Sequence, residues 1–346
     1  MVTINYLKMD KLELESELKS LEREYKKFID MGLKLDMSRG KPGAEQLDLS
    51  SRILDIITSA SDCKTSDKID CRNYGVPYGI SEIRDLFGEI MMVDPSNVVV
   101  GGNSSLNMMF DTISCFMTHS VNGYTPWIKQ EEIKFLCPVP GYDRHFSITE
   151  YYGIQMINVP MTNDGPNMDI VEKLVSEDSS IKGIWCVPKY SNPQGVTYSD
   201  EVVKRFARLK PKACDFRIFW DNAYALHDIS DTQDNLLSIM DECIKSGNED
   251  LPIIFSSTSK ITFPGSGVSA LAASERNLST LKKRYSVQTI GPDKINQLRH
   301  IRFFKDLNGI KNHMKKHKEI LRPKFDAVLD KLNKEFSDNN IIKWTN

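Results

Sequence analysis

The sequence lacks the features that would place a protein in a membrane or on a polyanion. It has no run of about 18 or more apolar residues, the length that spans a bilayer, so we expect no transmembrane helix and no membrane partner. Lys and Arg total 45 and Asp and Glu total 47, so there is no basic excess. Because nucleic-acid-binding proteins carry such an excess, we also expect no nucleic-acid partner.

Metal-site and disulfide patterns are absent as well. The seven cysteines are an odd number without a CxxC pair, and the six histidines show no metal-ligand spacing with them. The N-terminal stretch is charged throughout and has no apolar signal core. We therefore expect free thiols, no bound metal and a cytoplasmic location.

What the sequence does contain is an alternation of short apolar runs with amphipathic segments. The apolar runs predict strands at 96–102, 133–141, 153–160, 182–190, 216–224, 251–257 and 267–274. The amphipathic segments predict helices at 7–30, 104–117, 167–176, 199–209 and, in a polar basic stretch, about 293–335. That last stretch could be a nucleic-acid helix, but its interleaved acids favour a solvated helix. The alternation predicts an α/β fold with a mostly parallel sheet between helices.

Loops at the carboxyl ends of parallel strands are where ligands bind in such folds, and four of these loops carry unusual chemistry. "GGNSS" (101–105) leads from a strand into a helix and would cradle a phosphate, although plain helix capping explains it equally well. "SNPQG" (191–195) alone predicts a turn in which Gly195 permits positive φ. Asp221 ends a strongly apolar strand, where a carboxylate needs a cation, a donor or an N-cap role.

Lys260 is the single charged residue in "STSKITFPG", just after an apolar strand. A lysine desolvated near the sheet becomes a nucleophilic amine that forms Schiff bases with carbonyls. An aldehyde cofactor with a phosphate and a ring nitrogen would use all four loops, and pyridoxal 5'-phosphate is that cofactor. Its groups would meet these residues: Asn103, Ser104 and Ser105 (phosphate), Asp221 (ring nitrogen), Asn192 and Tyr224 (phenolic oxygen) and Lys260 (aldehyde).

The order of "RNYGVPYG", "GGNSS", "PVPGYDRH", "SNPQG", "DNAY" and "STSK" resembles the fold-type I, aspartate aminotransferase-like pyridoxal phosphate enzymes of class I/II. The likeness covers roughly residues 35–290, and within the family the chain resembles a divergent aspartate aminotransferase-like subgroup. It implies a helical segment of the small domain at 1–36 and a cofactor-binding large domain with a mostly parallel central sheet at 37–290. It also implies a connecting helix with the start of an incomplete C-terminal α+β small domain at 291–346.

The resemblance further implies a role for each matching residue. Lys260 matches the Schiff-base lysine, Asp221 the acid on the pyridine nitrogen, and Tyr142 the aromatic stacked on the ring. The remaining cofactor contacts would be Tyr224 and Asn192 at the phenolic oxygen, Asn103, Ser104, Ser105 and Ser257 at the phosphate, and Tyr74 reaching the phosphate from a neighbouring subunit. The last role implies a homodimer with shared active sites. Arg39, Gly40 and Lys41 in "SRGKPG", together with Asn192, are the expected substrate contacts.

Transamination between an L-amino acid and a 2-oxo acid through Lys260 is therefore the expected activity, and Arg39 and Lys41 favour an aspartate-like donor. A β-lyase or decarboxylase on the same scaffold, an effector-sensing domain and an inactive scaffold remain alternatives. Two departures from the family stand out. Gly267 lies where many relatives carry a phosphate-binding arginine, and the arginine expected for the substrate α-carboxylate would lie beyond Asn346.

Overall fold

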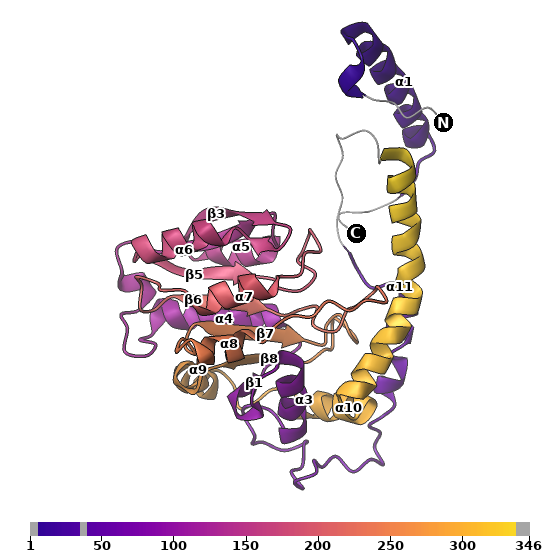
Figure 1. Cartoon of the computed structure of the whole chain (residues 1–346). Helices are drawn as coiled ribbons and strands as arrows, with labels where there is room; N and C mark the ends of the chain where they lie inside the picture. The colour runs from indigo at the N-terminus through magenta and orange to yellow at the C-terminus, as the bar shows by residue number, and fades with distance from the viewer. Residues whose placement is uncertain (1–5, 35–39, 337–346) are drawn as a thin grey trace.

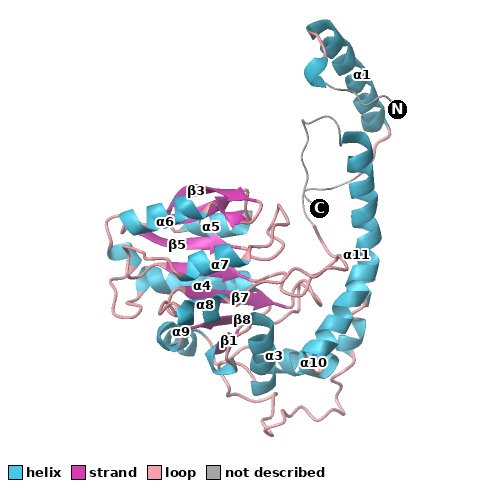
Figure 2. Cartoon of the chain, viewed as in Figure 1, coloured by secondary structure: helices cyan, strands magenta, loops and turns pink. Residues whose placement is uncertain are grey.

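The computed structural model describes residues 6–34 and 40–336. Within these residues the strands form an eight-stranded sheet in the order β1-β8-β7-β6-β5-β2-β3-β4 (Figures 1 and 2). The strands are β1 (Val98–Val100), β2 (Lys134–Val139), β3 (Gln155–Thr162), β4 (Gly165–Pro166), β5 (Ile181–Cys186), β6 (Arg217–Asp221), β7 (Pro252–Ser257) and β8 (Ser269–Ala273). The central pairs are parallel, whereas β8 runs antiparallel to both β7 and β1.

Helices cover both faces of the sheet. The helices of the described residues are α1 (Lys11–Asp30), α2 (Ala44–Asp48), α3 (Ser81–Met91), α4 (Ser105–Thr118), α5 (Asp143–Tyr151), α6 (Met168–Glu177), α7 (Asp200–Ala207), α8 (Ile239–Lys245), α9 (Glu275–Gln288), α10 (Lys294–Phe304) and α11 (Leu307–Phe336), of which α1 does not pack on the sheet. Strand alternation divides the core. Ile218 and Trp220 of β6 pack with α3, α6, α7, α8, α10 and α11, whereas Phe219 packs with α4, α5 and α9. Asp221, two residues after Phe219, therefore points to the side of the sheet that α5 covers.

The fold class expected from the sequence is confirmed, and so are the seven predicted strands. The structure adds the two-residue strand β4, which is too short to give a periodic signal. The predicted helix at 293–335 is two helices, because Lys305 takes a positive φ of 70° and ends α10. Residues 337–346, the last part of the expected small-domain segment, lie outside the described part of the chain.

Two helices extend away from the body that contains the sheet (Figure 1). Helix α1 has no buried residue, and in α11 the buried residues are Ile310, His313, Met314 and His317, all in its first half. Among the described residues, no helix has the length and apolar character needed to cross a membrane.

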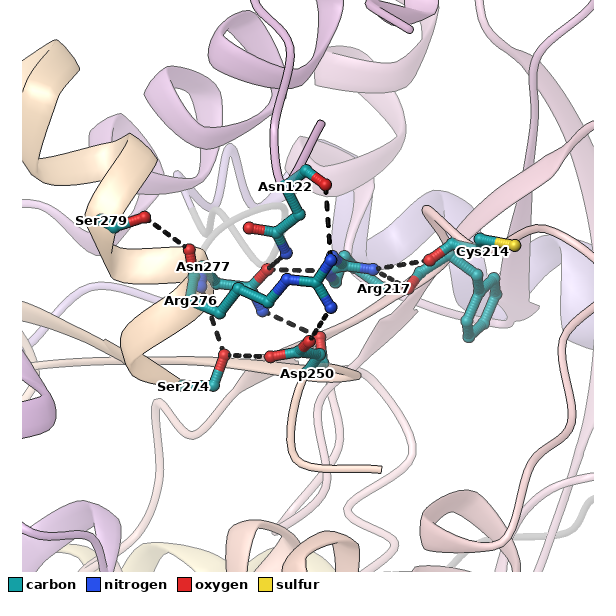
Figure 3. Close-up of polar contacts among 9 residues, drawn as sticks. Asn122, Cys214, Arg217, Asp250, Ser274, Arg276, Asn277 and Ser279 are labelled. Atoms are coloured by element: carbon teal, nitrogen blue, oxygen red, sulfur yellow. Dashed lines mark hydrogen bonds and ion pairs between the residues drawn. The ribbon is translucent and has the colours of Figure 1, made fainter. Parts of the chain in front are cut away.

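A buried arginine fixes the amino end of β6, the strand that ends at Asp221. Arg217 is 1% exposed, and its guanidinium donates to the Asn277 side chain (Nε to Oδ1, 3.1 Å) and to the Phe216 carbonyl (2.7 Å). Asn277 in turn donates to the Asp250 carbonyl at 2.8 Å, at the start of the next strand (Figure 3). Burial lowers the pKa of Arg217 to about 10. These bonds join β6 to α9 and to the segment entering β7, so the amino end of the strand that carries Asp221 is fixed.

Candidate active site

Lys260 lies in a turn that directly follows β7 at the carboxyl edge of the sheet. Backbone bonds from Ile261 and Thr262 to the Thr258 carbonyl (2.9 and 2.8 Å) close the turn. The Lys260 side chain is exposed, and its Nζ lies 4.8 Å from the centre of the Tyr224 ring. The lysine is therefore both reachable by a ligand and adjacent to a phenol.

Asp221 is the last residue of β6 and is buried, with 5% of its surface exposed. One oxygen, Oδ2, accepts a hydrogen bond from His145 Nε2 at 3.0 Å. The other, Oδ1, is buried and has no hydrogen-bond partner among the described residues. A buried carboxylate oxygen without a donor is costly, so this atom is suited to a ligand N–H, such as a protonated ring nitrogen.

Tyr224 and Asn192 come from the loops after β6 and β5, and their side chains lie close to each other. Burial raises the pKa of the Tyr224 phenol, the nearby Asp221 charge raises it further, and the Asn192 side chain opposes the rise. Asn192 is held in place because its loop closes on itself, with Ser191 N–H donating to the Val196 carbonyl at 2.9 Å. Gly195 has φ +73°, as its loop position suggested. The pair thus presents two polar groups toward one side of the site.

Tyr142 adds a further aromatic ring to the site. Its ring meets the His145 ring edge-on, with centres 5.0 Å apart and planes at 85°. Burial raises the pKa of Tyr142, the Lys260 charge lowers it, and the Asp221 charge raises it. Because both charges affect the pKa of Tyr142, this residue lies in the same cluster as Lys260 and Asp221.

A chain of hydrogen bonds connects the Lys260 turn to the loop that opens α4. Ser257 Oγ donates to Ser259 Oγ at 3.2 Å, and Ser259 Oγ donates to the Asn103 carbonyl at 2.9 Å. Ser104 is the N-cap residue of the 14-residue helix α4, yet its hydroxyl makes no capping bond. The Ser104 hydroxyl therefore does not occupy the backbone N–H groups of Ser105 and the following residues, and these groups are available to an anion. Ser257 is linked to the same loop by the hydrogen bonds given above.

Gly267 occupies a tight position behind this region. A Cβ built on Gly267 would lie 3.1 Å from Thr258 Oγ1 and 3.2 Å from the Ser259 nitrogen. An arginine at this position would therefore press on the turn that carries Lys260, and this close packing accounts physically for the glycine.

Some predicted residues lie apart from this cluster. Tyr74 is 80% exposed, and Gly40 and Lys41 are exposed, without a side-chain contact to the residues above. Arg39 lies outside the described residues. The cluster formed within one chain thus comprises these residues: Lys260, Asp221, Tyr224, Asn192, Tyr142 and His145, with Asn103, Ser104, Ser105 and Ser257 on the side where α4 begins.

His145 is a site residue that the sequence did not predict, because a single histidine in a helical stretch has no distinctive pattern. It lies in the first turn of α5 and is 1% exposed. Its position three residues after Tyr142 in "PGYDRH" was the available signal. The order of the strands, with β2 separated from β6 only by β5, brings α5 over Asp221. That order cannot be derived from local sequence patterns.

Comparisons of sequence and of structure both match this chain to aminotransferases. The family profile described as aspartate amino-transferase matches residues 9–346. A relative from Mycolicibacterium smegmatis is 43% identical over 97% of this chain and 78% of its own length. The aspartate aminotransferase of Corynebacterium glutamicum is 42% identical over 94% of this chain and 75% of the relative. A crystal structure of an aspartate transaminase from C. glutamicum superposes with a TM-score of 0.95 at 40% identity, covering 99% of this chain and 81% of that one.

Proposed function

The chain belongs to the aspartate aminotransferase family and is an aminotransferase, and we propose that it works with pyridoxal phosphate attached to Lys260. The observation that carries this proposal is the buried Asp221 Oδ1, which lacks a donor in a site that also contains an accessible lysine. Pyridoxal phosphate supplies a protonated pyridine ring that withdraws electrons from the substrate bond being broken.

The protein side chains would divide the work of binding and orientation. Asp221 would keep the ring nitrogen protonated, with His145 holding the carboxylate in place through Oδ2. Tyr224 and Asn192 would donate to the phenolic oxygen, and Tyr142 would lie against the ring face. The phosphate would be bound at the start of α4 by these residues: Asn103, Ser104, Ser105 and Ser257.

Lys260 would also act as the base. Its free Nζ would take the proton from the substrate Cα. General base catalysis of this kind typically contributes about 10²–10⁴-fold. The neighbouring Tyr224 ring, 4.8 Å from Nζ, would restrict the path of the amine to one side of the substrate.

The proposal also covers substrate selection, the assembly of a homodimer and the domain bounds. Arg39, Gly40 and Lys41 would contact the substrate carboxylate, together with Asn192, and would favour an aspartate-like donor. Tyr74, 80% exposed in the single chain, would reach the phosphate of a second subunit in a homodimer. The cofactor-binding domain would span 37–290, between small-domain segments at 1–36 and 291–346.

The test is covalent mapping of the cofactor. We expect purified protein to develop visible absorbance with pyridoxal phosphate, and borohydride reduction followed by peptide mapping to find the label on Lys260. Lys260→Ala should abolish the absorbance and lower amino transfer by at least about 10²-fold. Lys283→Ala, at an exposed position on α9, is the matched control. A label on another lysine would overturn the assignment, and amine loss without an added 2-oxo acid would indicate a lyase.

A further inference from the structure

Histidines gather around the turn that carries Lys260. Four of the six in the sequence bind residues 258–262 directly. They are His227, His300, His313 and His317. Two of them, His313 and His317, come from α11, about one helical turn apart, and α11 is the helix that leaves the body of the protein. None of the four has a part in the chemistry derived above, so their convergence requires its own explanation.

His313 and His317 share one acceptor. Their Nε2 atoms lie 3.0 and 3.1 Å from the Ile261 carbonyl oxygen, and 3.2 Å from each other. A carbonyl only accepts, so each Nε2 carries the hydrogen and each imidazole is in the Nε2–H tautomer, which means that the contact between the two Nε2 atoms is not itself a hydrogen bond. Both rings are buried, at 6% and 3% exposure. Two buried donors on a single backbone oxygen fix that oxygen in direction as well as in position.

The preceding carbonyl is bound in a similar way. His227 Nε2 donates to the Lys260 carbonyl at 3.3 Å. The two peptide planes that follow Lys260 are therefore both bound by imidazoles from outside the turn. Since the direction of a Cα–Cβ bond follows from the backbone dihedrals at that residue, these bonds also help to set the direction in which the Lys260 side chain leaves the turn.

The same histidine pair contacts the N-terminal segment. Gln46 Nε2 donates to His317 Nδ1 at 3.4 Å, and Ser50 Oγ lies 3.2 Å from His313 Nε2. Gln46 belongs to α2, which begins three residues after Lys41. The pair thus touches three parts of the chain at once: α11, the segment that follows Gly40 and Lys41, and the Lys260 turn.

The protonation state agrees with this geometry. Burial lowers the pKa of His313 to about 4, with the neighbouring His317 as a further cause, and burial also lowers the pKa of His317. Both rings are therefore neutral near pH 7. A neutral His317 has one donor and one acceptor, which are the two roles that Ile261 and Gln46 require.

We propose that His313 and His317 are positioning residues for Lys260. By binding the Ile261 carbonyl, they fix the turn that carries Lys260 relative to α11 and to the N-terminal segment. This proposal rests on the proposed role of Lys260. If the pair only filled core space, a ring of the same shape without nitrogen would serve as well. If the pair positions Lys260, such a ring would free the turn and misdirect the amine.

The experiment therefore compares His313→Phe and His317→Phe, which keep a planar ring, with His317→Gln, which keeps an N–H at a similar reach. In the protein without cofactor, hydrogen exchange at the Ile261 and Thr262 amides should be about tenfold faster in the Phe variants and near wild type in His317→Gln. In the holoenzyme, kcat should fall about tenfold with KM within twofold, and the apparent pKa read from the visible spectrum should shift.

Controls separate the possible failures. His119→Phe, at an exposed histidine at the end of α4, should change none of these readouts. Gln46→Leu keeps both imidazoles and should give a smaller change in the same direction, so it tests the idea even if a Phe variant fails to fold. Wild-type exchange and spectra in all of these variants would overturn the positioning role. If wild-type protein carried the cofactor label elsewhere than on Lys260, the proposed function would fail instead.

Discussion

The imidazole of His145 stacks on the indole of Trp185, with ring centres 4.6 Å apart and planes at 14°. Trp185 is itself fixed, because its Nε1 donates to Thr149 Oγ1 at 2.8 Å, one turn of α5 beyond His145. The stack holds the ring edge toward Asp221, where the 3.0 Å bond forms. A strand residue and a helix residue thus set the direction of the one donor that Asp221 has among the described residues.

His145→Phe tests this arrangement. The Phe ring can keep the stack on Trp185, but it leaves both Asp221 oxygens buried without a donor. We expect a loss of about 1–3 kcal/mol in the free energy of unfolding of the cofactor-free protein. The measurement is denaturant unfolding of wild type and variant without cofactor. Equal stability of the two proteins would mean that the bond contributes nothing to Asp221.

Asp221→Asn keeps the shape of the side chain and removes its charge. Because the ring nitrogen would then lose the carboxylate that keeps it protonated, we expect retained cofactor and a kcat lowered by about 10²-fold or more. Steady-state kinetics with an amino acid and a 2-oxo acid, alongside cofactor stoichiometry, provides the measurement. Asp164→Asn, at an exposed turn between β3 and β4, is the control. Near-normal turnover in Asp221→Asn would exclude the electron-withdrawing arrangement.

The buried histidines predict a pH dependence of stability. Burial lowers the pKa of His300 to about 4, and of His313 to about 4. Between about pH 4 and the ordinary value of about 6.5, the unfolded chain binds protons that the folded chain does not. The free energy of unfolding therefore falls as the pH is lowered through this window, by up to about 1.4 kcal/mol per pH unit for each histidine.

His300→Gln should reduce that slope. The His300 ring is 1% exposed, donates from Nδ1 to the Asn296 carbonyl at 2.8 Å and accepts at Nε2 from Thr258. Urea unfolding at pH 5 and pH 7 measures the slope in wild type and variant. An unchanged difference between the two pH values would show that His300 is not the buried neutral group inferred here.

Gly267→Ala should destabilise the Lys260 turn by about 1 kcal/mol. The atom that the new methyl group would approach, Thr258 Oγ1, cannot move freely, because it accepts from Val268 N–H at 2.9 Å and bonds His300. Gly265→Ala is a matched control in the same loop, since an added Cβ there meets nothing within 4 Å. The two melting temperatures provide the comparison, and equal values would show that the turn can relax.

Local sequence patterns were sufficient for the strands and for the loops that end them, since apolar runs and turn residues are short-range signals. Lys260, Asp221 and Asn192 each follow such a run, and the structure places all three at one edge of the sheet. The histidines could not be placed in this way. His145 and His313 reach the site through the order of strands and the path of α11, which depend on packing between residues far apart in sequence.

Helix α11 is 30 residues long, and His317 is its last buried residue. At 1.5 Å per residue, the 19 residues from there to Phe336 reach about 29 Å further. A tilt of about 5° at the histidine pair would sweep the far tip through about 2.5 Å. Because the histidine pair binds the residue that follows Lys260, a small change of angle at this turn corresponds to a much larger displacement at the far end of α11.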